Sequence, residues 1–413
     1  MSTGVPGPNA VAADAIASDA AAADPIFIVG LYKNGTSWLL SALAAHPQFA
    51  ALRELDVLRS VAGRKGRRLL PPDERLANVF GRSAFCALRA EQLAPKAFHA
   101  HLGAADAGPA RSLYQLPPHV AIAVISSMLR AEGGRQMPGL SDGIASGFRN
   151  FPAPVLERAF SALRDAGEPV AAMDGFLAAL MPALPPARRL VLKGADQVRC
   201  FDALRDWRPG APKIAIVRDG RDAAVSAFHY RQLMRERRMA WHHGHLSFVK
   251  PLALARDAGI GGVTALRRGL GYGPDWRLGR SMSVWADRVR RVLAGAERGE
   301  LYVMRYEDLL DDFASSFSRL LTWLGADASP ATVAKIAEAT SFEAMSGRPR
   351  GVSGEDVMRR GIAGEWRESL NRRDQALAWR VAGAELTAMG YTREGKPQAF
   401  QPGGRNPGRP PEK

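Results

Sequence analysis

The segment Gly30–Ser37 has the residue types and the spacing of an anion-binding turn. It matches the phosphate-binding pattern G-x-x-x-x-G-K-[ST], except that Thr36 stands at the lysine position and the lysine, Lys33, comes three residues earlier. An apolar run, 25–30, leads into the turn, and a stretch with helical spacing, 37–47, follows it. Because a turn between a strand and a helix directs several backbone N–H groups at one anion, the segment predicts a phosphate or sulfate site.

A second candidate anion site follows another apolar run, 212–219. Arg218 stands near the end of this predicted strand, and Ser226 lies eight residues later, within the helical pattern that follows. A guanidinium at a strand end and a hydroxyl on the adjoining helix can converge on one phosphate. Asp222 lies between them, and the alternative for it is an acid that interacts favourably with the positive end of the helix. The alternative for Arg218 and Arg221 is a solvated basic turn.

These segments resemble the sulfotransferases that use 3′-phosphoadenosine 5′-phosphosulfate (PAPS). The stretch GLYKNGTSWL, residues 30–39, is similar to the loop of that family that binds the 5′-phosphosulfate. The order Arg218, Asp222, Ser226 is similar to its 3′-phosphate signature. The stretch MRRGIAGEWRESL, residues 358–370, resembles its late segment that closes over the nucleotide. The resemblance covers 25–47, 188–230, 285–325 and 355–370.

The resemblance implies the residues that bind the donor. Those at its 5′ end would be Lys33, Asn34, Gly35, Thr36, Ser37 and Trp38, and those at its 3′-phosphate would be Arg218, Ser226, Arg359, Arg360 and Gly361. Tyr306 is implied to lie near the adenine, and a structural hydrogen bond is the equal alternative. Lys33 would stabilise the leaving phosphate without a metal ion, so no metal is expected.

The reaction also needs a base, because the acceptor hydroxyl or amine loses a proton as the sulfur is attacked. In the cytosolic branch of the family this base is a histidine two residues after a lysine. Here Lys193 is present, but Ala195 stands at the histidine position. Glu54 resembles the base of the tyrosylprotein and carbohydrate branches, and its alternative is a surface ion pair. The predicted catalytic residues are therefore Lys33, Glu54 and Lys193.

Apolar runs alternate with helical patterns along much of the chain. The predicted strands are 25–30, 188–194, 212–219 and 300–310, and one of the predicted helices is 313–324. This alternation predicts an α/β fold of three layers, P-loop-like, with a central parallel sheet flanked by helices. The segments 55–187 and 231–284 lack the alternation and are predicted to be helical insertions that cap the active-site edge on the acceptor side.

Both ends of the chain differ in composition from its middle. Residues 1–24 are rich in Ala, Asp, Ser, Gly and Pro, and 393–413 are rich in Gly, Pro and basic residues. Such sequences bury too little apolar surface to fold. We expect a disordered leader, one sulfotransferase domain over 25–392 and a disordered basic tail.

Composition narrows the class of protein. The 56 basic and 41 acidic side chains give a net charge of +15, which favours anionic ligands. No module with interleaved aromatic residues indicates nucleic-acid binding. The 2 cysteines are too few for a disulfide framework or a four-thiolate zinc site. No secretory signal and no apolar stretch of about 18 residues is present, so a cytoplasmic enzyme without a membrane span is expected.

The alternative function is a phosphotransferase or NTPase with a degenerate phosphate loop. That chemistry needs a lysine directly after Gly35 and an acidic residue at a strand end to hold Mg²⁺. Thr36 does not meet the first condition, and Arg218 precedes Asp219 at the strand end. The acceptor is expected to be a small molecule, a lipid or a carbohydrate, and the sequence does not distinguish among them.

Overall fold

The computed structural model describes residues 24–52, 153–183, 188–194, 197–245, 250–354 and 358–395. Contacts between residues divide the chain into two compact units. Unit 1 holds the chain up to Val29 and from Leu39 to Lys213. Among the described residues, unit 2 holds Gly30–Trp38 and those from Ile214 to Gly395, so it contains most of the residues predicted to bind the donor.

Unit 1 is built on three parallel strands in the order β2-β3-β1. Their bounds are β1, Ile26–Ile28; β2, Phe49–Leu52; and β3, Arg189–Lys193. The register pairs Ile28 with Lys193. Parallel strands are covered on both faces and therefore consist of apolar residues. Ile26, Phe27 and Ile28 are accordingly all buried.

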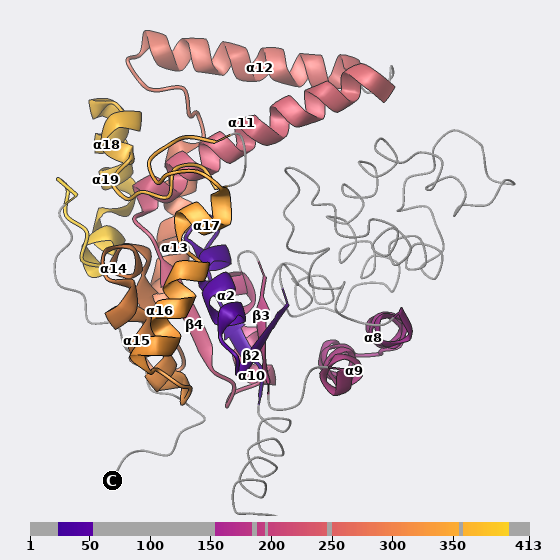
Figure 1. The fold of residues 1–413 in the computed structure, drawn as a ribbon. Coiled ribbons are helices and arrows are strands. Elements are labelled where there is room, and N and C mark those ends of the chain that lie inside the picture. Colours follow the sequence, from indigo (N-terminus) through magenta and orange to yellow (C-terminus); the bar gives the residue numbers. More distant parts are fainter. Residues whose placement is uncertain are drawn as a thin grey trace, which may run out of the picture. The chain divides into compact units, whose positions relative to one another are not determined.

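The helices of unit 1 follow its strands along the chain. They are α2, Thr36–Ala45, which begins in unit 2; α8, Ala153–Asp165; α9, Pro169–Leu180; and α10, Phe201–Trp207, with short 3-10 turns at Met181–Ala183 and Gln197–Cys200. Helices α8 and α9 pack against each other (Figure 1). Proline at the start of α9 suits the first turn of a helix, where its missing N–H costs nothing.

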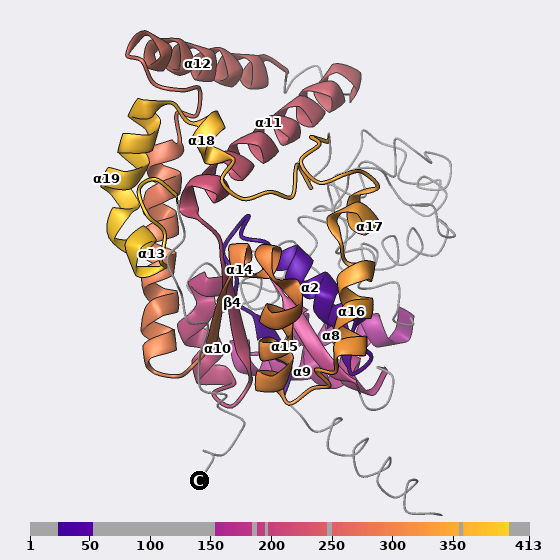
Figure 2. The same ribbon diagram turned by 60° about the vertical axis from the view of Figure 1, so that its left-hand side comes forward.

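Unit 2 contains two parallel strands, β4, Lys213–Val217, and β5, Tyr302–Arg305, with Val217 opposite Arg305. Its helices are α11, Gly220–His245; α12, Lys250–Gly269; α13, Leu278–Glu297; α14, Tyr306–Asp311; α15, Phe313–Leu324; α16, Pro330–Ala339; α17, Phe342–Ser346; α18, Trp366–Ser369; and α19, Arg372–Ala388. Helix α12 turns back over α11 (Figure 1), and α19 lies along α13 (Figure 2). The loop Gly30–Trp38 and the first turn of α11 thus belong to one unit.

Parallel strands alternating with helices confirm the predicted α/β fold. Each of the four predicted strands is present as β1, β3, β4 or β5, and α15 has the predicted bounds. Strand β2 was not predicted. The last predicted strand extends to 310, whereas β5 ends at Arg305 and a helix begins at Tyr306. Where they are described, the segments 55–187 and 231–284 are mostly helical. None of the helices in the described ranges is apolar enough over sufficient length to span a membrane.

Candidate functional site

The loop Gly30–Trp38 follows β1 and turns through two residues in the left-handed backbone region. Lys33 has a φ of 64° and Gly35 a φ of 89°. A side chain on Gly35 would place its Cβ 2.5 Å from Cδ2 of Tyr306, so only glycine fits there. A non-glycine residue such as Lys33 stores backbone strain in this region, which is a feature of functional sites.

Asn34 links this loop to the end of β4. Its side chain is fully buried. Its Oδ1 accepts a hydrogen bond from the backbone N–H of Arg218 at 2.7 Å, and its Nδ2 donates to the carbonyl of Tyr32 at 2.9 Å. The two segments predicted to bind anions therefore lie next to each other within unit 2. Asn34 was predicted to contact the donor, whereas this link to Arg218 was not predicted.

Tyr306 packs between the loop and Arg218. Its ring is buried, lies edge-on to Trp38 with centroids 5.5 Å apart, and has the guanidinium carbon of Arg218 4.7 Å from its centroid. Burial raises the pKa of its phenol. Trp38 in turn donates its indole N–H to the carbonyl of Thr340 at 2.9 Å. These are ring contacts and not a hydrogen bond of the Tyr306 hydroxyl, so a place near the adenine and a structural hydrogen bond both stay predictions for this residue.

The side chain of Arg218 is almost fully buried, and not all of its N–H groups have a hydrogen-bond partner among the described residues. One terminal nitrogen donates to the carbonyl of Ile362 at 2.7 Å and lies 3.8 Å from Oδ2 of Asp222. Its Nε is buried and has no partner among the described residues. Burial lowers the pKa of this guanidinium, but its acidic neighbours, Asp222 first, outweigh burial and raise the pKa above its ordinary value. Arg218 is therefore a fixed cation.

The late loop, residues 358–366, brings a second arginine to this site. Arg359 forms an ion pair with Glu365, and its NH1 is buried without a partner among the described residues. Burial lowers the pKa of Arg359; Glu365 opposes this effect, and the nearby charges of Arg360 and Arg218 lower the pKa further. Arg218 and Arg359 are therefore like charges that a dianion between them would stabilise.

Arg360 and Gly361 shape the late loop in this structure. Arg360 donates from Nε to the carbonyl of Gly351 at 2.8 Å, and its NH1 lies 3.4 Å from Oε1 of Glu365. Gly361 has a φ of 66°, and a Cβ there would lie 2.3 Å from Cδ2 of Phe342. These contacts fix the path of the backbone directly after Arg359.

Asp222 binds the late loop through both carboxylate oxygens. It accepts the backbone N–H of Gly364 at 2.6 Å and that of Trp366 at 2.8 Å, and burial raises its pKa. Its position in the first turn of α11 agrees with the sequence interpretation. These two long-range bonds were not predicted. Ser226, one turn further along α11, is half-buried, and no hydrogen bond to its hydroxyl is found within the described ranges.

Glu307, a buried carboxyl behind Arg218, was not identified from the sequence. Its Oε1 accepts the backbone N–H of Asp219 at 3.0 Å, and its Oε2 accepts the hydroxyl of Tyr391 at 2.6 Å. Burial raises the pKa of Glu307 to about 7. Tyr391 is 84 residues away along the chain, so no local pattern indicates the contact.

Lys33 contacts an aromatic side chain on α11. Its Nζ lies 3.8 Å from the ring centroid of Tyr230, which is a cation–π distance. His229, the neighbouring residue, has its pKa lowered by burial and by the charge of Arg359. The imidazole is therefore predominantly neutral at pH 7.

Of the other two predicted catalytic residues, the structure describes only Lys193. Lys193 is buried at the end of β3 in unit 1. Glu54 lies outside the described residues. In the part of the chain that the structure describes, no three His, Cys, Asp or Glu side chains are grouped so as to hold a metal ion.

Several solved structures resemble this chain over most of its length. Mouse sulfotransferase SULT7A1 complexed with PAP is 14% identical with a TM-score of 0.41, covering 91% of this chain and 90% of that chain. The sulfotransferase domain from the curacin biosynthetic pathway is 14% identical with a TM-score of 0.41, covering 87% and 97%. Sulfotransferase STF9 from Mycobacterium avium is 14% identical with a TM-score of 0.40, covering 94% and 82%.

Two sequence models of protein families match the chain. The model described as "Sulfotransferase family" matches residues 25–259, and that described as "Sulfotransferase domain" matches residues 207–390. The first match alone covers more than half of the chain, and together they include the loop at Lys33, the arginine at 218 and the late loop. The protein therefore belongs to the sulfotransferase family, enzymes that transfer a sulfuryl group from PAPS to an acceptor.

Proposed function

We propose that unit 2 binds PAPS with the loop Gly30–Trp38 at the 5′-phosphosulfate and with Arg218 and the late loop at the 3′-phosphate. The hydrogen bond from Arg218 N to Asn34 Oδ1 carries this proposal, because it keeps the two anion-binding segments adjacent. One nucleotide with an anionic group at each end fits such a pair of segments.

The unpaired donors of the site fit the 3′-phosphate. Arg218 Nε and Arg359 NH1 are buried without partners among the described residues, and a buried unpaired donor costs about 1–3 kcal/mol. Phosphate oxygens would satisfy both donors and relieve the repulsion between the two guanidinium groups. The hydroxyl of Ser226 and the backbone around Arg360 and Gly361 complete this part of the proposed site.

The loop supplies the groups for the transferred sulfuryl end. Thr36 and Ser37 begin α2, and the first turn of a helix favours an anion because its backbone N–H groups and the helix dipole point toward it. Lys33 is proposed to neutralise the negative charge that develops on the leaving phosphate, and Lys193 to assist at the sulfuryl group. Glu54 is proposed to accept the proton of the acceptor.

The proposed acceptor is a hydroxyl or an amine of a small molecule, a lipid or a carbohydrate. A screen of such acceptors with radiolabelled PAPS tests the proposal. Lys33→Ala should lower turnover with a confirmed acceptor by about 100-fold or more, the usual effect of removing one group that stabilises transition-state charge. Turnover that survives in Lys33→Ala would contradict the role of this residue.

Glu54→Gln tests the base separately. The amide keeps the size of the side chain but cannot accept a proton, so turnover should fall by about 100-fold or more while the affinity for the donor stays the same. Unchanged turnover would assign the base to another residue.

A further inference from the structure

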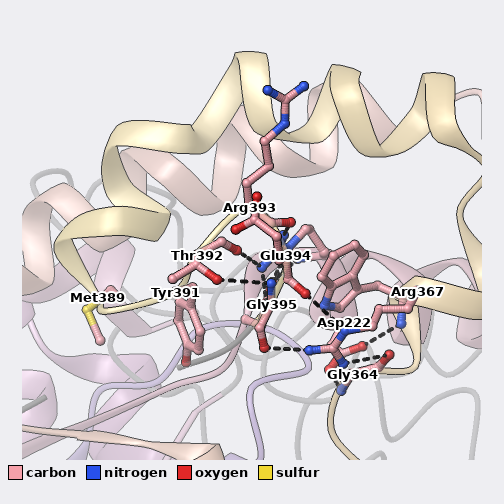
Figure 3. A network of polar contacts seen from close by, with 12 residues as sticks. Asp222, Gly364, Arg367, Met389, Tyr391, Thr392, Arg393, Glu394 and Gly395 are labelled. Carbon is pink, nitrogen blue, oxygen red and sulfur yellow. Dashed lines mark hydrogen bonds and ion pairs between the residues drawn. The ribbon is translucent and has the colours of Figure 1, made fainter. Parts of the chain in front are cut away.

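Past helix α19, residues Thr392–Gly395 form a closed turn, here called the terminal turn (Figure 3). The backbone N–H of Gly395 donates to both the carbonyl and the hydroxyl of Thr392, each at 3.1 Å. Residues 393–413 were predicted to be a disordered tail, but residues 393–395 are part of this turn.

Two arginines bind all four carbonyls of the terminal turn. Arg221 donates from NH2 to the carbonyl of Thr392 and from NH1 to that of Arg393, both at 2.9 Å. Arg367 donates from Nε to the carbonyl of Glu394 at 3.2 Å and from NH2 to that of Gly395. Since every acceptor is a backbone carbonyl, the side chains of the turn give no sequence signal for this contact.

The same two arginines lie against Trp366, at the end of the late loop. The guanidinium carbon of Arg221 is 3.7 Å from the centroid of the indole, and that of Arg367 is 5.1 Å from it. Arg221 is itself buried and paired with Asp219 at 2.7 Å, which rules out the alternative of a solvated basic turn at this residue. Trp366 therefore contacts both guanidinium groups, and its backbone N–H donates to Asp222 at 2.8 Å.

The chain is anchored directly before the terminal turn. The hydroxyl of Tyr391 donates to Glu307 at 2.6 Å, and Arg305 donates to the carbonyl of Met389 at 3.4 Å. The turn is thus held at a fixed place within unit 2 when it meets Arg221 and Arg367.

From these contacts we infer that the terminal turn is a strap that holds the late loop in the conformation that binds the 3′-phosphate. Arg221 and Arg367 are its positioning residues. The inference rests on the proposed function, because Arg359 must contact the 3′-phosphate for the conformation of the late loop to affect donor binding. A loop that spends less time in the binding conformation lowers the apparent affinity in proportion.

Two nucleotides separate this role from general stability. Adenosine 3′,5′-bisphosphate (PAP) carries both phosphates, whereas adenosine 5′-monophosphate (AMP) lacks the 3′-phosphate. Calorimetric titration measures the dissociation constants. Arg367→Ala should lower the affinity for PAP about tenfold, because the binding conformation of the late loop becomes about tenfold less populated, and should leave the affinity for AMP unchanged. Arg367→Lys, which can still donate to the turn, should restore part of the PAP affinity.

Two further variants complete the experiment. Arg380→Ala removes an exposed arginine from α19 and should bind both nucleotides like the wild type. Arg218→Ala should abolish the preference for PAP over AMP. If Arg218→Ala keeps this preference, the proposed 3′-phosphate site is wrong, and the inference about the strap is wrong as well. If Arg218→Ala loses the preference while Arg367→Ala retains it in full, the proposed function stands and the strap is overturned.

Discussion

Asn34 is the residue that connects the two parts of the proposed donor site. Its amide is bound at both ends by backbone groups, and its removal would leave the N–H of Arg218 without this partner. Asn34→Ala should lower the free energy of unfolding by about 1–3 kcal/mol and should lower the affinity for both PAP and AMP. Urea unfolding and nucleotide titration measure these two effects. Wild-type affinity for both nucleotides in this variant would show that the link does not position the site.

Glu307 makes stability depend on pH. Its pKa is raised by burial to about 7 in the folded protein, against an ordinary value of 4.5, and Asp219, Tyr391 and Arg218 are its charged or titratable neighbours. Above about pH 4.5 the unfolded chain releases this proton while the folded protein retains it, so the free energy of unfolding should fall by about 3 kcal/mol as the pH rises to about 7, and then level off.

Glu307→Gln should remove this part of the pH dependence. The amide can still accept the N–H of Asp219 and can donate to the hydroxyl of Tyr391, so the variant should be more stable relative to the wild type at about pH 8 than at about pH 5. Urea unfolding at both pH values measures the difference. If the free energies of unfolding of the variant and the wild type differ by the same amount at both pH values, the raised pKa of this carboxyl is contradicted.

At the scale of elements, the late loop docks on the first turn of α11 through Asp222. Asp222→Asn keeps one acceptor oxygen but places an N–H₂ group opposite a backbone N–H, so one of the two bonds to Gly364 and Trp366 must break. Because Arg359 lies in the same loop, PAP should bind about tenfold more weakly, and AMP should bind as before.

A matched control is available in another helix. Asp202 is also an acid in the first turn of a helix, α10, but its side chain is 44% exposed. Asp202→Asn should leave the binding of both nucleotides unchanged. An equal effect of the two substitutions would mean that loss of an acid at a helix start, rather than release of the late loop, weakens PAP.

The strands that were predicted correctly each contain at least three consecutive large or β-branched apolar residues or alanine flanked by isoleucine: Ile26–Ile28 in β1, Leu190–Leu192 in β3, Ile214–Val217 in β4 and Tyr302–Met304 in β5. Every residue from Ile214 to Val217 in β4 is buried, so the pattern leaves little choice of structure. Strand β2 reads Phe-Ala-Ala-Leu, and its two alanines give it little strand propensity. At Arg305–Tyr306 the strand passes directly into a helix without a turn residue, so the sequence carries no sign of the boundary.

The candidate site was predictable to the extent that local motifs encode it. The turn at Lys33 and the arginine at 218 stand beside strands and helices that the sequence itself indicates. The contacts that hold them together join residues 184 apart, from Asn34 to Arg218, and 142 apart, from Asp222 to Gly364. Such pairs depend on the tertiary fold, and no local pattern in a single sequence specifies them.

At the scale of the whole molecule, the net charge of +15 attracts any anionic nucleotide. Charge alone therefore cannot select PAPS over ATP, and selection must come from where the cations are held. In the proposed function the loop at Lys33 binds one end of the nucleotide and Arg218 the other. A substitution at Lys33 should therefore weaken the binding of the 5′ end of the nucleotide, and one at Arg218 the binding of its 3′ end.

A titration of two variants with three nucleotides tests this claim most directly. Lys33→Ala should lower the affinity for AMP and PAP and leave that for adenosine 3′-monophosphate unchanged. Arg218→Ala should lower the affinity for adenosine 3′-monophosphate and PAP and leave that for AMP unchanged. Loss of one charged hydrogen bond predicts a change of about tenfold or more in each case. The opposite pattern, or equal weakening of all three nucleotides by both substitutions, would contradict a donor held at its two ends by these two segments.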